Sequence, residues 1–119
     1  MRKLFTLLVV FLLTGCSGST FENVTTEKAK ELIDEEKVIV LDVRTPEEYN
    51  SGHIADSELV PLQVFEGMSE DLEKDKNYLL VCRSGNRSQQ AAEILTSKGF
   101  KNVYNMTGGM NSWTYEIEQ

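Results

Sequence analysis

The chain has 119 residues, which is room for one domain, and its 40% hydrophobic and 26% charged residues are an ordinary globular balance. With two prolines, eight glycines and no internal repeat, the composition excludes collagen-like and low-complexity chains. The formal net charge of -7 would repel phosphate backbones, so we expect no nucleic-acid partner.

The chain opens with the pattern of a secretory signal peptide. Arg2 and Lys3 give it a positive start, and residues 4–13 are apolar apart from Thr6. This stretch is about half of the roughly 20 residues that a helix needs to cross a bilayer. It therefore predicts a targeting segment rather than a transmembrane helix.

A predicted lipid attachment site follows the apolar stretch. Residues 13–16, Leu-Thr-Gly-Cys, resemble the bacterial lipobox, in which the cysteine is lipidated and becomes the new N-terminus. The alternatives are a plain signal peptide with a chance cysteine, or an anchor that is left uncut. We predict a signal peptide at 1–15, a lipidated Cys16 with a tether at 16–20, and an extracytoplasmic lipoprotein anchored in a membrane of the cell envelope.

Residues 21–119 are predicted to form the folded domain, in which helical and strand patterns alternate. The run 38–43 is apolar apart from Asp42, as in a strand buried on both faces of a parallel sheet. Such alternation predicts an α/β fold with a mainly parallel central sheet. We predict helices at 25–36, 45–51, 64–72, 88–98 and 110–117, and strands at 38–43, 57–60, 78–81 and 103–106.

The strongest chemical signal is Cys82, which follows the predicted strand 78–81. In parallel α/β sheets, ligands bind beyond the carboxyl ends of the strands. The residues after Cys82 can expose backbone N–H groups in a tight turn, add two cations and lead into a helix N-terminus, all of which favour an anion. The predicted anion-binding loop comprises Arg83, Ser84, Gly85, Asn86, Arg87 and Ser88.

These surroundings predict that Cys82 is largely ionised at neutral pH, because nearby cations and a helix N-terminus lower the pKa of a thiol. If Cys16 carries lipid, Cys82 has no disulfide partner, and a lone thiol in an exported protein is a candidate reactive group. The alternative is a buried, inert cysteine beside solvated arginines. With one histidine and one available cysteine, we predict no metal site and no cofactor.

Several segments together resemble the single-domain rhodaneses over about residues 21–116. The resemblance implies a three-layer domain, with a mainly parallel central sheet flanked by helices. The chain departs from the family at 56–59, where a glycine, a small residue and an asparagine are usual. The matching segments are the loop 82–88, Leu-Asp-Val-Arg at 41–44 with Pro-Glu-Glu-Tyr at 46–49, Gly-His-Ile at 52–54 with Pro61, and Gly-Gly-Met at 108–110 with Trp113.

The resemblance implies sulfurtransferase chemistry through a persulfide on Cys82, with a small anionic donor such as thiosulfate and a thiol or cyanide as acceptor. The loop from Cys82 to Arg87 spans six residues, whereas phosphatases on similar cradles use a loop one residue longer. The alternatives are a persulfide carrier or redox-sensing module, a phosphatase or arsenate reductase, and a structural lipoprotein with a relic fold.

Other residues of these segments have predicted supporting roles. Arg87 is expected to orient the loop or bind the anionic donor, and Arg83 to bind the donor; the alternative for both is a solvated side chain. Asp42 and Arg44 are expected to form an ion pair or hydrogen-bond network beneath the loop. For these two residues, a purely structural role is expected at least as much as a catalytic one. We predict that His53 is packed and hydrogen-bonded rather than a general base.

Overall fold

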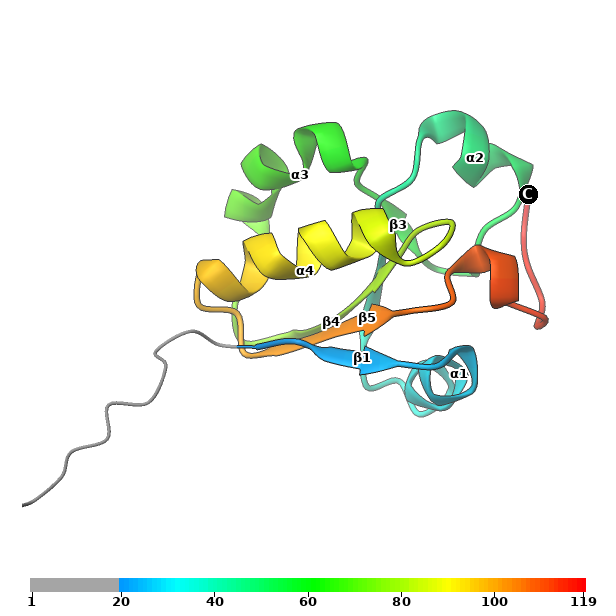
Figure 1. The fold of residues 1–119 in the computed structure, drawn as a ribbon, viewed down its shortest axis with the longest axis horizontal. Helices are drawn as coiled ribbons and strands as arrows, with labels where there is room; N and C mark the ends of the chain where they lie inside the picture. The colour runs from blue at the N-terminus through cyan, green and yellow to red at the C-terminus, as the bar shows by residue number, and fades with distance from the viewer. Residues whose placement is uncertain (1–19) are drawn as a thin grey trace, which may run out of the picture.

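The computed structural model describes residues 20–119, so the predicted signal peptide and Cys16 lie outside the described residues. Five parallel strands form one sheet in the order β1-β5-β4-β2-β3 (Figure 1). The strands are β1 (Glu22–Val24), β2 (Ile39–Asp42), β3 (Glu58–Leu59), β4 (Asn77–Val81) and β5 (Asn102–Met106). The helices are α1 (Thr26–Asp34), α2 (Pro46–Ser51), α3 (Leu62–Met68) and α4 (Asn86–Ser97).

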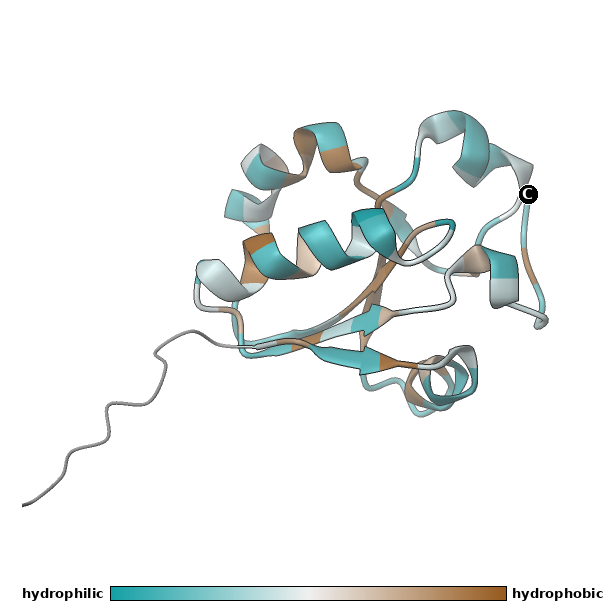
Figure 2. Cartoon of the chain, in the orientation of Figure 1, coloured by the Kyte–Doolittle hydropathy of each residue, from teal (hydrophilic) through white to brown (hydrophobic). Residues whose placement is uncertain are grey.

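The domain has three layers, because the sheet buries a different set of side chains on each face. Alternate residues of β4 point to opposite faces, so Leu80 packs with Leu95 of α4 while Leu79 packs with Ala29 of α1. Helices α3 and α4 cover one face and α1 covers the other (Figure 1). Figure 2 shows the apolar residues concentrated on the central strands and the polar ones on the outer surfaces of the helices. The predicted three-layer α/β fold is confirmed.

Helix α2 begins where the sequence predicts, because Thr45 and Glu48 form a capping box. The Thr45 hydroxyl accepts the Glu48 N–H, the Glu48 carboxylate accepts the Thr45 N–H, and Pro46 occupies the first turn. Helix α1 begins after Thr25, whose hydroxyl accepts the Lys28 N–H. Within residues 20–119, no helix is long and apolar enough to span a bilayer.

Some elements differ from the prediction. Strand β1 was missed, because its three residues are stabilised by pairing with β5, some 80 residues away in the sequence. The helix predicted at 110–117 was wrong. Only a 3-10 turn forms at Met110–Ser112, and the chain then extends until Glu118 pairs with His53. The helix does not continue, because Trp113 is already extended and the backbone N–H and carbonyl of Glu118 are bonded to those of His53 instead of to helical neighbours.

The departure at 56–59 is accommodated locally. Asp56 has a φ of 64°, in the left-handed region that glycine adopts most readily and that aspartate also tolerates. Ser57 then closes the turn, since its N–H and its hydroxyl both donate to the carbonyl of Ile54. The chain therefore reaches β3 without the usual glycine.

Candidate active site

Cys82 lies at the carboxyl end of β4, in the middle of the sheet, where the chain turns toward α4. Its side chain is only 1% exposed and belongs to the apolar cluster beneath α4. Arg83, Ser84 and Asn86 are exposed, whereas Gly85 and Ser88 are buried with the thiol. The loop thus encloses the sulfur from one side and presents polar groups to solvent on the other.

The Sγ atom of Cys82 accepts hydrogen bonds from the loop and from the first turn of α4. The Gly85 N–H donates to it over 3.1 Å, and the Ser88 hydroxyl lies 3.3 Å away. Burial raises the pKa of the thiol, but the Ser88 hydroxyl and the N–H groups of Ser88, Gly85 and Ser84 lower it by more. The net effect is a Cys82 pKa below the ordinary value of 9.0, in agreement with the predicted direction.

The loop is braced by the segment that follows β5. The N–H groups of Met110 and Asn111 donate to the carbonyls of Cys82 and Arg83. This approach requires Gly109, which has a φ of 63° and at which a Cβ would overlap the Arg83 carbonyl. Gly85, with a φ of 100°, lies against the Thr107 carbonyl in the same way. Two of the glycines in the sequence motifs are thus explained by close backbone contact around Cys82.

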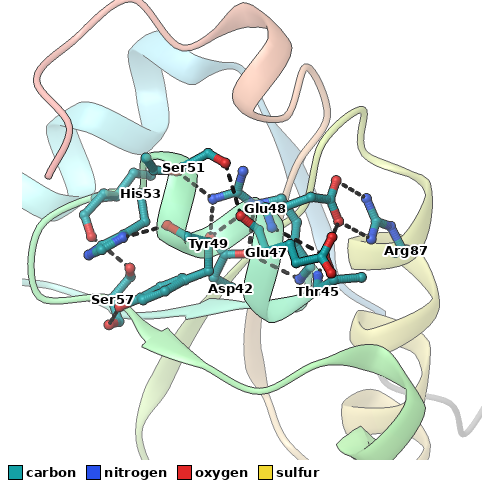
Figure 3. Close-up of polar contacts among 12 residues, drawn as sticks. Asp42, Thr45, Glu47, Glu48, Tyr49, Ser51, His53, Ser57 and Arg87 are labelled. Carbon is teal, nitrogen blue, oxygen red and sulfur yellow. Dashed lines mark hydrogen bonds and ion pairs between the residues drawn. The ribbon is translucent and has the colours of Figure 1, made fainter. Parts of the chain in front are cut away.

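Arg87 forms an ion pair that the sequence pattern does not predict. Its two terminal nitrogens donate to the two carboxylate oxygens of Glu48 over 2.7 and 2.9 Å (Figure 3). The guanidinium of Arg87 and the N–H and hydroxyl of Thr45 hold the pKa of Glu48 at about 2, against an opposing effect of burial. This pair joins the first turns of α2 and α4. The only signal in the sequence was the capping box that fixes Glu48.

Asp42 and Arg44 form the predicted ion pair. The guanidinium of Arg44 donates to both carboxylate oxygens of Asp42 and to the carbonyl of Gly52. Both side chains are buried, at 1% and 6% exposed. Asp42 is paired in register with Val81, the residue before Cys82. The ion pair therefore lies at the carboxyl edge of the sheet, next to the strand that ends in the thiol.

His53 is packed and hydrogen-bonded, as predicted. Its ring stacks on that of Tyr49 with 3.7 Å between the ring centroids, and its Nδ1 lies 2.8 Å from the Tyr49 carbonyl. The Tyr49 hydroxyl donates to the Ser57 carbonyl (Figure 3). These contacts fix the turn between α2 and β3.

A small cavity of about 150 Å³ opens beside Arg87, between the starts of α2 and α3. It is lined by Val43, Arg44, Thr45, Pro46, Pro61, Leu62, Gln63 and Arg87. In the described part of the chain, no group of three or more histidine, cysteine and acidic side chains is arranged to hold a metal ion. What the site offers is a stabilised thiolate within a cradle of amides.

The sequence pattern of the rhodanese-like domain family matches residues 25–116. The chain belongs to the rhodanese-like family. Thiosulfate sulfurtransferase GlpE of Pseudoalteromonas translucida is 36% identical over 93 residues, which cover 78% of this chain and 89% of that protein. The putative sulfur carrier protein YrkF of Bacillus subtilis is 34% identical over 103 residues, which cover 86% of this chain but 56% of YrkF.

The rhodanese-like fold is equally clear among solved structures. A rhodanese-like domain protein from Staphylococcus aureus superposes with a TM-score of 0.74 at 33% identity. That match covers 82% of this chain and 96% of the Staphylococcus protein. The predicted family and fold class are therefore confirmed.

Proposed function

We propose that the protein is a sulfurtransferase that moves a sulfane sulfur from a donor such as thiosulfate to a thiol or cyanide acceptor, with Cys82 carrying the sulfur. The observation that carries this proposal is the coordination of Sγ. Its hydrogen bonds from Gly85 and Ser88 stabilise an anion at that position. The same donors can stabilise the terminal sulfur of a persulfide, which is also an anion.

The reaction has two steps. In the first, the Cys82 thiolate attacks the outer sulfur of thiosulfate, the bond between the two donor sulfurs breaks, and sulfite leaves with the electron pair. In the second, cyanide or an acceptor thiolate attacks the terminal sulfur of the persulfide. The Cys82 thiolate leaves, which regenerates the enzyme and gives thiocyanate or a new persulfide.

The loop residues have distinct proposed roles in these steps. The amides from Arg83 to Ser88 hold the sulfur anion, and the exposed guanidinium of Arg83 attracts the donor. Arg87 orients the loop, since its guanidinium is already paired with Glu48. The buried pair of Asp42 and Arg44 supports the edge of the sheet from which the loop departs.

The length of the loop favours sulfur over phosphate as the group bound. Six residues run from Cys82 to Arg87, and the loop amides converge on one sulfur atom. A tetrahedral phosphate needs a wider ring of hydrogen-bond donors. We therefore expect turnover of thiosulfate with cyanide, and none of an aryl phosphate or of arsenate. Hydrolysis of an aryl phosphate that depends on Cys82 would favour the phosphatase alternative instead.

A persulfide carrier is the second candidate, and two observations favour it. The Cys82 side chain is almost completely buried, and one relative is named a putative sulfur carrier protein. The thiosulfate–cyanide assay separates the two functions. A carrier would accept one sulfur per chain without sustained release of thiocyanate, whereas the enzyme would release many equivalents, and Cys82→Ala would release none.

We also propose that the domain is held at a membrane of the cell envelope through lipid on Cys16. This proposal is supported by the sequence alone, namely the basic start, the short apolar stretch and the lipobox-like residues 13–16. Two acyl chains suffice for stable anchoring. Replacement of Cys16 by serine should move the protein from the membrane fraction to the soluble or unprocessed fraction.

A further inference from the structure

The cations around Cys82 are unequally available. The guanidinium of Arg44 is neutralised by Asp42, and that of Arg87 by Glu48. Arg83 is exposed, and no ion pair reaches it from any residue between 20 and 119. The site therefore offers one unpaired cation, rather than three, to an anionic sulfur donor.

We propose that Glu48, acting through Arg87, makes the site select sulfur donors with one negative charge over donors with two. Glu48 is a positioning residue in this account, because it touches Arg87 and not the donor. The inference rests on the proposed sulfurtransferase function and names the class of donor that this function would use. The class comprises singly charged anions that carry a terminal sulfane sulfur, such as thiosulfonates and organic persulfides.

The geometry makes the neutralisation of Arg87 permanent. Both terminal nitrogens of Arg87 face the carboxylate, as the two dashed lines in Figure 3 show. The Thr45 N–H and hydroxyl also donate to the Oε1 atom of Glu48, so the carboxylate cannot easily turn away. With a pKa of about 2, Glu48 stays ionised over the whole range in which a thiolate attacks a donor.

The electrostatic consequence follows from the unequal pairing of these three cations. One charge of a bound anion can be balanced by Arg83, but the second charge of a dianion has no partner. The net charge of the chain disfavours a bound dianion further, because the chain carries 19 acidic residues against 12 basic ones. A close ion pair attracts an anion far less than a free cation does, since the opposite charges largely cancel.

The test uses two donors that differ by one charge. Thiosulfate is a dianion at neutral pH, and methanethiosulfonate has a methyl group in place of one oxygen and is a monoanion. Each transfers its outer sulfur to the Cys82 thiolate by the same cleavage of a sulfur–sulfur bond, and sulfite or methanesulfinate leaves with the electron pair. The test compares kcat/KM for thiosulfate with kcat/KM for methanethiosulfonate, as a ratio. Both values are measured on the full chain in a nonionic detergent.

The ratio cancels the intrinsic reactivities of the donors when variants are compared. In Glu48→Gln the ratio should rise at least about fivefold, mainly through a lower KM for thiosulfate, because the charge of Arg87 is then no longer cancelled. The amide oxygen of the introduced glutamine can still accept the Thr45 N–H, so the start of α2 is retained. In Arg87→Gln the ratio should fall, and the double substitution should return it near the wild-type value.

Glu47→Gln is the matched control. It changes the net charge equally on the same helix, yet the Glu47 side chain is exposed and has no hydrogen bond or ion pair within the described chain. An unchanged ratio in Glu48→Gln, or an equal rise in Glu47→Gln, would overturn the inference. Failure of both donors to add sulfur to Cys82 would instead overturn the proposed function, so the two failures are distinguishable.

Discussion

The Cys82 thiolate is stabilised by hydrogen bonds rather than by direct contact with a cation. Both arginines of the loop direct their charge elsewhere, one to solvent and one to Glu48. The Ser88 hydroxyl and three amides are the groups that lower the pKa of the thiol against its burial. The reactivity of this residue therefore depends on the first turn of α4 more than on the charge of the loop.

The Ser88 hydroxyl gives a prediction at this scale. Ser88→Ala should raise the pKa of Cys82 by about one unit, because a hydrogen bond to a charged group contributes roughly 1.5 kcal/mol. The pH dependence of iodoacetamide alkylation measures this pKa. Ser84→Ala is the control, since Ser84 contributes through its backbone N–H. The midpoint of its alkylation rate against pH should match that of the wild type. A shift in Ser84→Ala as large as that in Ser88→Ala would contradict the assignment.

The sequence was informative about the position of Cys82 at the end of β4 and less so about its surroundings. Cys82, the turn-rich loop and the pair of Asp42 and Arg44 could all be predicted, because these residues are close together in the sequence or belong to one motif. The partner of Arg87 could not be predicted, because Glu48 is 39 residues away and meets it only when the fold brings the first turns of α2 and α4 together.

At the scale of elements, α2 and α4 are joined across the site by the Glu48–Arg87 ion pair. The folded-state pKa of Glu48 is about 2, against an ordinary value of 4.5, so the pair stabilises the fold fully above pH 4.5. This contribution should disappear as the pH falls from 4.5 to 2. Urea unfolding should show Glu48→Gln to be less stable by about 1–2 kcal/mol at pH 7, after allowance for solvent screening. A difference that persists undiminished near pH 2.5 would contradict this origin.

The turn after β5 gives a second prediction for elements. Gly109→Ala should destabilise the domain by about 2 kcal/mol or more and slow sulfur transfer, because a Cβ overlaps the Arg83 carbonyl and displaces the loop. Gly99→Ala is the matched control, since Gly99 also has a positive φ but lies in open space. That variant should lose about 1 kcal/mol and retain activity. Chemical denaturation and the thiosulfate–cyanide assay measure the two effects.

Most elements could be predicted because their signals are local. Buried runs predict β2 and β4, and caps predict α1 and α2. The elements that were missed or wrong depend on distant contacts. Strand β1 is stabilised by β5, and the residues after Met110 are held by the carbonyls of Cys82 and Arg83 and by the pairing of Glu118 with His53. Local propensity carries no information about such partners.

In the whole molecule, the described chain begins beside the amino ends of the strands, and the active site lies at their carboxyl ends (Figure 1). All strands are parallel, so their amino ends lie together and Cys82 follows the carboxyl end of β4. From Asn77 to Cys82 the chain advances about 17 Å, at roughly 3.3 Å per residue. Most lysines of the described domain lie near the amino ends of the strands. These are Lys37, Lys74, Lys76, Lys98 and Lys101.

If Cys16 carries lipid, this topology predicts that the catalytic loop points away from the membrane. A fluorophore at position 101 should then be quenched by a quencher in the lipid headgroups, while one at position 86 should not. The full chain would be reconstituted in vesicles, with Cys82 replaced by serine to allow labelling. Quenching at position 86 but not at position 101 would show the opposite orientation. Sulfur donors and acceptors would, on this account, reach the site from the aqueous phase.

The proposed function requires that Cys82 take up one sulfur atom from a small anionic donor. Intact-mass measurement of the purified protein after incubation with thiosulfate detects this sulfur atom. We expect a gain of one sulfur atom per chain, which a thiol reductant or cyanide removes and which Cys82→Ala lacks. An unchanged mass in the wild type, or the same gain in Cys82→Ala, would contradict it.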